Sequence, residues 1–107
     1  MEQRVESVLQ EYSQWLAEAK QRADWCASPP NNATDISLRL TTVSELESSM
    51  HRGNELRDAS RRKIDQFKET LDADAVFRLQ KRVASNEDEH QSLRRLLDSI
   101  RCVTNNS

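Results

Sequence analysis

The chain has 107 residues, of which 36% are hydrophobic and 32% charged, and a formal net charge of −2. This length is enough for one domain. The 16 basic and 18 acidic residues are well mixed, so the chain lacks the basic block that nucleic-acid binding requires. No apolar run approaches the roughly 20 residues of a membrane span, and the first residues lack the pattern of a signal peptide. We therefore expect neither nucleic-acid binding nor membrane insertion.

An apolar seven-residue repeat first appears in residues 2–27, where the sequence predicts a helix. Its seam positions alternate by three and four: Val5, Val8, Tyr12, Trp15 and Ala19. Leu9 and Leu16 flank this seam and widen it. Spacings of three and four keep side chains on one face of a helix, and a strict seven-residue period favours left-handed supercoiling. Pro29 and Pro30 should stop the helix, because proline lacks the amide donor.

A second repeat predicts a longer helix over residues 36–71. Its seam positions are Ile36, Val43, Leu46, Met50, Gly53, Arg57, Ser60, Ile64, Phe67 and Leu71. A glycine inside a helix costs up to about 1 kcal/mol relative to alanine. Gly53 therefore suggests a close approach by a bulky side chain, and Tyr12, Trp15 and Met50 are the candidates at this height of the bundle.

A third repeat predicts a helix over residues 74–102. Its seam positions are Leu79, Val83, Asn86, His90, Leu93, Leu97 and Ile100. The flanking apolar positions in the second and third helices are Leu40, Leu56 and Leu96. We expect Thr34 or Asp35 to cap the second helix and Asp72 or Asp74 to cap the third. The break between these two helices is very short, so they should be antiparallel neighbours.

These elements predict an all-α protein, with residues 1–107 forming one three-helix, up-down-up, left-handed bundle. At about 1.5 Å per residue the second helix would be roughly 50 Å long, which suits a rod better than a globule. The expected core includes Tyr12, Trp15, Leu16, Met50, Gly53, Ile64, Phe67, Leu79, Val83, Leu93 and Leu97.

The stretch from Leu9 to Leu16 resembles the marker of the spectrin repeat, a Trp in the middle of the first helix followed by an aliphatic residue; here these are Trp15 and Leu16. The resemblance covers nearly the whole chain through its length and heptad phase, and it implies a triple-helical repeat. The chain departs from the family where many repeats carry a second Trp, because His90 occupies that seam position and Asn86 precedes it. It is most similar to divergent repeats of giant linkers such as dystrophin, nesprins and plakins.

Four residues are candidates for a polar layer or a partner contact. Arg57, Asn86 and His90 occupy seam positions that are usually apolar, and mirrored pairing of the second and third helices puts them close together. The simplest interpretation is a hydrogen-bonded layer that fixes register; the alternatives are a pH-sensitive layer and a notch for a partner. Trp25 lies beside the first seam near the prolines, where it could pack under the connection or contact an adjoining repeat or partner.

No residue pattern predicts catalysis, a cofactor or a metal. Cys26 and Cys102 are expected to be reduced thiols, although both lie toward one pole of the bundle, where a cross-link is conceivable. His51 is spaced by four from Glu47 and Glu55, which could bind a metal weakly, but an exposed helix face is the simpler interpretation. The chain also lacks a nucleophile motif and a glycine-rich phosphate loop. We therefore expect a protein that is not an enzyme.

The resemblance implies a structural rod or spacer that also serves as a protein-interaction module of a larger cytoskeletal linker or scaffold. Its implied partners are adjacent repeats of the same chain and cytoskeletal, actin-associated or membrane-associated proteins. The implied location is the cytoplasm, on the cytoskeleton, at the cell cortex or nuclear envelope through other domains. The alternative is a stand-alone helical-bundle adaptor that binds a partner helix where the polar seam packs poorly.

Overall fold

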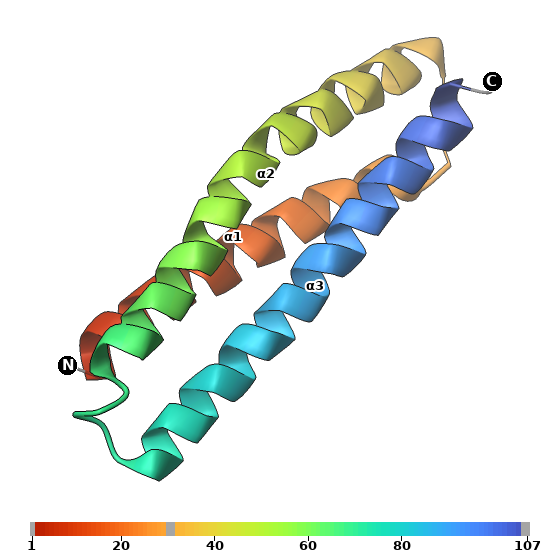
Figure 1. Ribbon diagram of the computed structural model, residues 1–107. Coiled ribbons are helices and arrows are strands. Elements are labelled where there is room, and N and C mark those ends of the chain that lie inside the picture. The colour runs from red at the N-terminus through yellow and green to blue at the C-terminus, as the bar shows by residue number, and fades with distance from the viewer. Residues whose placement is uncertain (1, 30–31, 106–107) are drawn as a thin grey trace.

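The computed structural model describes residues 2–29 and 32–105, which form three α-helices. These are α1 (Glu2–Ala27), α2 (Ala33–Phe67) and α3 (Ala73–Asn105). The helices lie side by side and run up, down and up, so that α1 begins at one pole and α3 ends at the other (Figure 1). The Cα atoms span 55 × 18 × 16 Å. The predicted all-α three-helix bundle is confirmed, and each helix packs against both others.

The first connection, between residues 27 and 33, contains the two prolines of the sequence. α1 ends at Ala27. The amide of the next residue, Ser28, donates to the Trp25 carbonyl oxygen at 3.2 Å. α2 begins three residues earlier than predicted because Asn32 is its N-cap, with Oδ1 accepting from the Asp35 amide at 2.8 Å. The expectation that Thr34 or Asp35 caps this helix is therefore wrong, and both lie in its first turn.

The second connection is longer than the sequence suggested. α2 ends at Phe67 instead of residue 71, and the Phe67 carbonyl accepts from the amides of Thr70 and Leu71, each at 3.0 Å. Asp72, one of the two expected caps, accepts from the Ala75 amide at 2.7 Å. α3 consequently starts at residue 73 and continues to residue 105.

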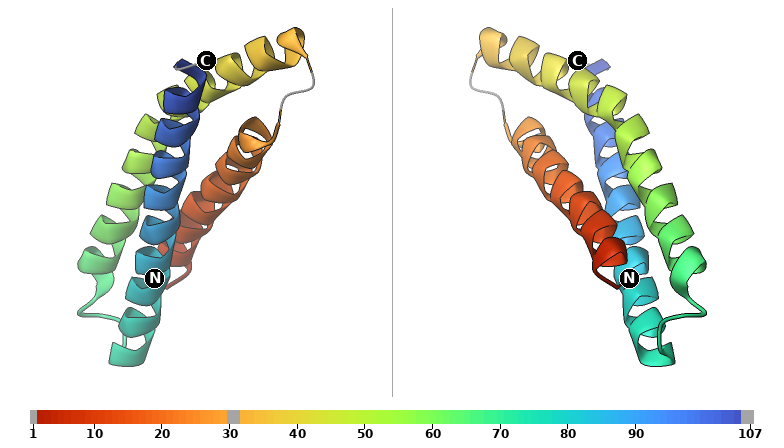
Figure 2. Two further views of the ribbon diagram at one scale, coloured as in Figure 1. Left: turned by 90° about the vertical axis from the view of Figure 1, so that its right-hand side faces the viewer. Right: turned by 90° about the vertical axis from the view of Figure 1, so that its left-hand side faces the viewer.

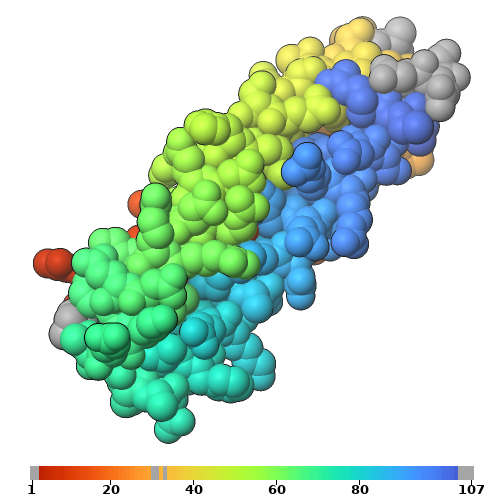
Figure 3. Space-filling view, in the orientation of Figure 1, coloured from red at the N-terminus to blue at the C-terminus, as the bar shows by residue number. Residues whose placement is uncertain are grey.

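Buried apolar side chains form two clusters along the rod, one toward each pole. The upper cluster, toward the α1–α2 connection, consists of Tyr12, Leu16, Ala19, Ala23, Cys26, Val43, Leu46, Leu56, Leu93 and Leu97. The lower cluster, toward the α2–α3 connection, consists of Val5, Leu9, Ile64, Phe67, Leu79 and Val83. The space-filling view shows α2 and α3 packed along the length of a thin rod (Figure 3).

The seam of α1 differs from the predicted one. Leu9 and Leu16, expected to flank it, are 0% and 2% exposed, whereas Val8 and Trp15 are half-buried at its edge. Both sets have spacings of three and four, so the period alone could not decide which set faces the other two helices. Met50 is half-buried as well, and it packs with Trp15 against the upper cluster.

The seam of α2 is interrupted at both ends. Ile36, expected on the seam, is 43% exposed because the first turns of α2 lean away from α1 (Figure 2). Leu71 lies in the second connection, half-buried against the lower cluster. Between these ends Gly53 and Ser60 are buried, and Arg57 is half-buried. The seam of α3 follows the prediction from Leu79 to Ile100, with only its last position half-buried.

No helix in the described part of the chain combines the length and apolar character needed to cross a bilayer.

Candidate functional site

A buried polar pair lies halfway along the rod. The Tyr12 hydroxyl of α1 and Nδ1 of His90 in α3 are 2.6 Å apart, and these residues are 0% and 5% exposed. With Nδ1 as the acceptor, the tyrosine donates its proton to a neutral imidazole. The tyrosine pKa is raised above its usual value, first by burial and then by the negative charge of Glu87. The hydroxyl therefore stays protonated and can act as the donor.

A second polar pair lies one turn away, again between α1 and α3. Asn86, 8% exposed, donates through Nδ2 to the Ser13 Oγ at 3.0 Å, and the Ser13 hydroxyl lies 3.2 Å from the Asn86 Oδ1. In α2, the fully buried Ser60 hydroxyl donates a hydrogen bond to the Leu56 carbonyl oxygen of the same helix at 2.8 Å. Throughout residues 2–29 and 32–105, every buried side-chain nitrogen and oxygen has a hydrogen-bond partner.

Aromatic rings connect the Tyr12–His90 pair to α2. The His90 ring meets the Tyr12 ring edge-on at 5.6 Å between centroids and the Trp15 ring at 5.4 Å, with interplanar angles of 72° and 63°. Trp15 in turn lies on Gly53, where an added Cβ would overlap the indole atoms Cη2 and Cζ3. Of the three candidates for the approach to Gly53, Trp15 is the residue that makes it.

The polar layer, defined as Tyr12, Ser13, Ser60, Asn86 and His90, lies at the junction of the two apolar clusters. Tyr12 belongs to the layer through its hydroxyl and to the upper cluster through its ring. In α3 the lower cluster ends at Val83 and the upper cluster starts at Leu93, so both polar residues of that helix lie between them. In α2 the clusters are divided in the same way around the buried serine. The core is therefore apolar, polar and apolar along the rod, with all three helices contributing to the middle.

Charge around the layer disfavours a positively charged imidazole. The pKa of His90 is lowered, first by burial and then by the nearby guanidinium groups of Arg57 and Arg94, while Glu87 acts in the opposite direction. Arg57, predicted to belong to the layer, contributes through its charge; its Nε donates to Asp58 Oδ1 at 3.2 Å. The polar layer is consequently built around a neutral histidine.

A second candidate site, at the upper pole, is the arginine clamp, which consists of Arg39, Asp35 and the carbonyls of Ser28 and Pro29. Arg39 of α2 is 8% exposed and donates to the Ser28 carbonyl and, at 3.1 Å, to the Pro29 carbonyl, which follow the end of α1. Asp35 holds the same guanidinium, with Nη2 and Oδ2 2.9 Å apart. The guanidinium also lies 4.9 Å from the centre of the Trp25 ring, and Trp25 remains 39% exposed. A cation thus satisfies carbonyls at the negative end of α1.

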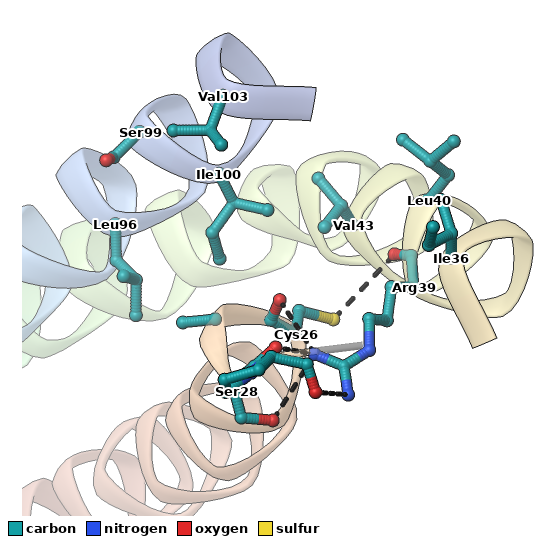
Figure 4. Close-up of a pocket in the computed structure, with 12 residues that line it drawn as sticks. Cys26, Ser28, Ile36, Arg39, Leu40, Val43, Leu96, Ser99, Ile100 and Val103 are labelled. Carbon is teal, nitrogen blue, oxygen red and sulfur yellow. Dashed lines mark hydrogen bonds between the residues drawn. The ribbon is translucent and has the colours of Figure 1, made fainter. Parts of the chain in front are cut away.

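An open groove of about 530 Å³ lies beside this clamp. Figure 4 shows side chains from α2 and α3 facing the end of α1 across it. Its apolar lining comes mainly from Ile36, Leu40, Val43, Leu96, Ile100 and Val103. Cys26 lines the groove from α1, and burial raises the pKa of its thiol despite the nearby positive charge of Arg39. This thiol is thus a weak nucleophile.

The remaining candidate residues do not assemble into a site. Among the residues that the structure describes, neither Cys26 nor Cys102 takes part in a disulfide. His51 pairs with Glu55 at 2.9 Å on an exposed face, whereas Glu47 pairs with Arg101 of α3. Within the described residues, no three His, Cys, Asp or Glu side chains are placed to hold a metal ion.

Sequence reasoning named His90, Asn86 and Trp25 but missed Ser13 and Arg39. Ser13 is adjacent to Tyr12 and gives no periodic signal, so only the crossing of α1 and α3 reveals it. Arg39 could have been suspected, because it follows Asp35 by four residues next to the proline-terminated helix, a spacing that places opposite charges together.

A scan against protein-family models, a search of curated proteins and a search of solved structures each gave no match. The likeness to the spectrin repeat therefore rests on the residues and the helical pattern alone.

Proposed function

We propose that the chain is a structural rod and protein-interaction module, one spectrin-like repeat of a larger cytoskeletal linker or scaffold. The observation that carries this proposal is the shape: a bundle of 55 × 18 × 16 Å in which α1 starts at one pole and α3 ends at the other (Figure 1). Modules of this geometry can be joined in series, so that each adds its length to the whole. Adjacent repeats and cytoskeletal or membrane-associated proteins are the proposed partners.

The polar layer supports this role because its hydrogen bonds fix the position of α1 relative to α3, while Trp15 packed on Gly53 fixes α1 relative to α2. A sliding helix would bury Tyr12, Asn86 or His90 without its partner, and an unsatisfied buried polar group costs about 1–3 kcal/mol. A spacer benefits from fixed register, since its length is then defined. Ion pairs between helices, such as Arg22 with Glu45 at 2.6 Å, lie on the surface and add little.

Small-angle scattering with sedimentation tests the rod. We expect a monomer whose longest dimension matches the 55 Å span of the Cα atoms once side chains are added. A head-to-tail fusion of two copies should be about twice as long, because the α3 end of one copy lies at the pole opposite its α1 start. A folded-back fusion of unchanged length would contradict the proposal, and so would a tight dimer of the single chain.

A second candidate function is an adaptor that binds a partner's amphipathic helix, and the groove at the upper pole is the observation that favours it. The sequence had suggested such a site at the polar layer, but the groove lies away from that layer. Adding a Leu- and Lys-based amphipathic peptide should shift the NMR signals of groove residues, and Ile36→Glu should abolish the shifts. Phe77→Glu is the matched control, since Phe77 is an exposed apolar residue in α3 outside the groove. Equal binding by all three proteins would eliminate the adaptor.

A further inference from the structure

The middle of the rod depends on the protonation state of one side chain. His90 is 5% exposed and touches the two aromatic residues that α1 sends across the bundle, Tyr12 and Trp15. One of these rests on Gly53 of α2. The imidazole thereby contacts α1 directly and α2 through the Trp15 ring. A change in its charge therefore alters the packing between all three helices.

A proton on His90 would reverse its hydrogen bond, because Nδ1–H would then donate to the Tyr12 oxygen and the hydroxyl proton would lose its acceptor. With its own proton on Nε2, the neutral ring accepts at Nδ1 a hydrogen bond from the Tyr12 hydroxyl, 2.6 Å away. A protonated imidazole carries N–H groups at both nitrogens and has no acceptor left. The hydroxyl, 0% exposed, would have to turn its proton toward another buried acceptor. The cation would also lose the hydration that it has in water.

The charged groups around His90 do not offset this cost. Arg57 of α2 and Arg94 of α3 both act against a positive charge on the ring. Glu87 of α3 favours it, but its carboxylate is engaged with the guanidinium of Arg61, whose Nε donates to Oε1 at 3.1 Å. From α1 the facing titratable group is the neutral tyrosine.

The position of the layer decides what an added charge does. It lies at the junction of two apolar clusters that have no residue in common, so the other residues of each cluster can stay packed while the layer, Tyr12 included, opens. We propose that the polar layer is a proton-operated joint: when His90 takes up a proton in mildly acidic solution, the helices separate at the middle of the rod before either apolar cluster comes apart. This inference is independent of the rod function, because it concerns the bundle alone.

The direction of the pH effect follows from linkage. The pKa of His90 in the folded bundle lies below the value of 6.5 for an unperturbed histidine. As the pH falls through about 6.5, the unfolded or opened chain binds the proton first, so stability is full above that pH and declines below it until the folded pKa is reached. For each pKa unit by which the folded value lies below the unfolded one, the population of the opened state rises about tenfold once the pH has fallen below both values.

Denaturant unfolding from about pH 7.5 to pH 5 tests the source of the effect. The chain has two histidines, which provides a matched control. The wild-type protein and His51→Gln should lose stability alike across this range, because His51 is exposed, whereas His90→Gln should lose much less. Retention of the full loss by His90→Gln, or no loss in the wild type, would overturn the proposal.

Two measurements on the wild-type protein keep the test decisive if His90→Gln does not fold. An NMR titration should show the His90 ring protonating below pH 6.5; a midpoint at or above that value overturns the joint. Hydrogen exchange at about pH 5.5, corrected for intrinsic rates, should show a loss of protection of up to about tenfold in residues 12–13 and 86–91. Leu79 and Val83 in the lower cluster should change much less, and an even loss along the helices contradicts a local joint.

Discussion

The core of this bundle is interrupted twice, and the two interruptions are built differently. In the polar layer, hydrogen bonds and aromatic contacts between Tyr12, Trp15 and His90 fill the space. At the upper pole the helices diverge and leave a groove of about 530 Å³ that no side chain of the described residues fills. The first interruption restricts how the helices fit together, whereas the second leaves apolar side chains in contact with water. Substitutions should therefore be costly in the layer and tolerated, or even favourable, at the groove.

The two tryptophans give the largest expected contrast. Trp15→Ala removes the ring that lies on Gly53 and His90, and a truncation of this kind costs about 3–5 kcal/mol. Trp25→Ala removes a ring that is 39% exposed and its contact with Arg39, worth about 0.5–1 kcal/mol. Denaturant unfolding of both variants measures the difference. Equal losses would mean that the upper pole is packed as tightly as the layer.

Gly53 provides the next test. In an ordinary helix, Gly→Ala stabilises by about 1 kcal/mol. Here the new methyl group would overlap the Trp15 ring, so Gly53→Ala should destabilise by about 1–3 kcal/mol. In a Trp15→Ala background the same substitution should become neutral or stabilising, because the obstructing ring is gone. A thermodynamic cycle over the four proteins measures this coupling, and additive effects would disprove the close approach.

The hydrogen bond of the layer should give a smaller effect that depends on both partners. Tyr12→Phe leaves the buried His90 without its partner and should cost about 1–3 kcal/mol. Tyr12→Phe combined with His90→Leu removes both polar groups, so the double variant should be more stable than the single one and should lose its sensitivity to mild acid. Unfolding at about pH 7 and pH 5.5 checks both expectations. A double variant weaker than Tyr12→Phe would show that the pair contributes more than register.

How far the sequence predicts this structure can be judged residue by residue. The heptad period was sufficient to predict three helices, each antiparallel to the next, and the α3 seam follows it from Leu79 to Leu97. The period could not choose between Trp15 and Leu16 as the inward position of α1, because that depends on where two other helices lie. The predicted ends of α2 were also wrong. At its start, Asn32, Thr34 and Asp35 are all suitable N-cap residues, and the geometry of the connection determines that Asn32 is the cap.

The candidate site was predictable only in part. Asn86 and His90 stood out because polar residues at seam positions are unusual, and Gly53 suggested a bulky neighbour. Their partners did not stand out: Ser13 is an ordinary surface residue type, and the link to Tyr12 spans 78 positions along the chain. The groove was not predicted at all, because Ile36, Leu40 and Ile100 continue the apolar pattern even where the helices diverge. A periodic sequence indicates which faces are apolar, not how closely they meet.

Filling the groove should give the smallest effect, with a sign opposite to that in the closed core. Ile100 of α3 is half-buried and faces the groove (Figure 4), so Ile100→Phe adds apolar atoms to open space and should stabilise by about 0.5–1 kcal/mol. Leu93→Phe makes a comparable enlargement two turns earlier in the same helix, where the side chain is 3% exposed in the upper cluster, and overpacking there should cost about 1–3 kcal/mol. Thermal or denaturant unfolding of the two variants compares them directly. Destabilisation by both would mean that the groove closes in solution, and the contrast between a filled layer and an open pole would then have to be abandoned.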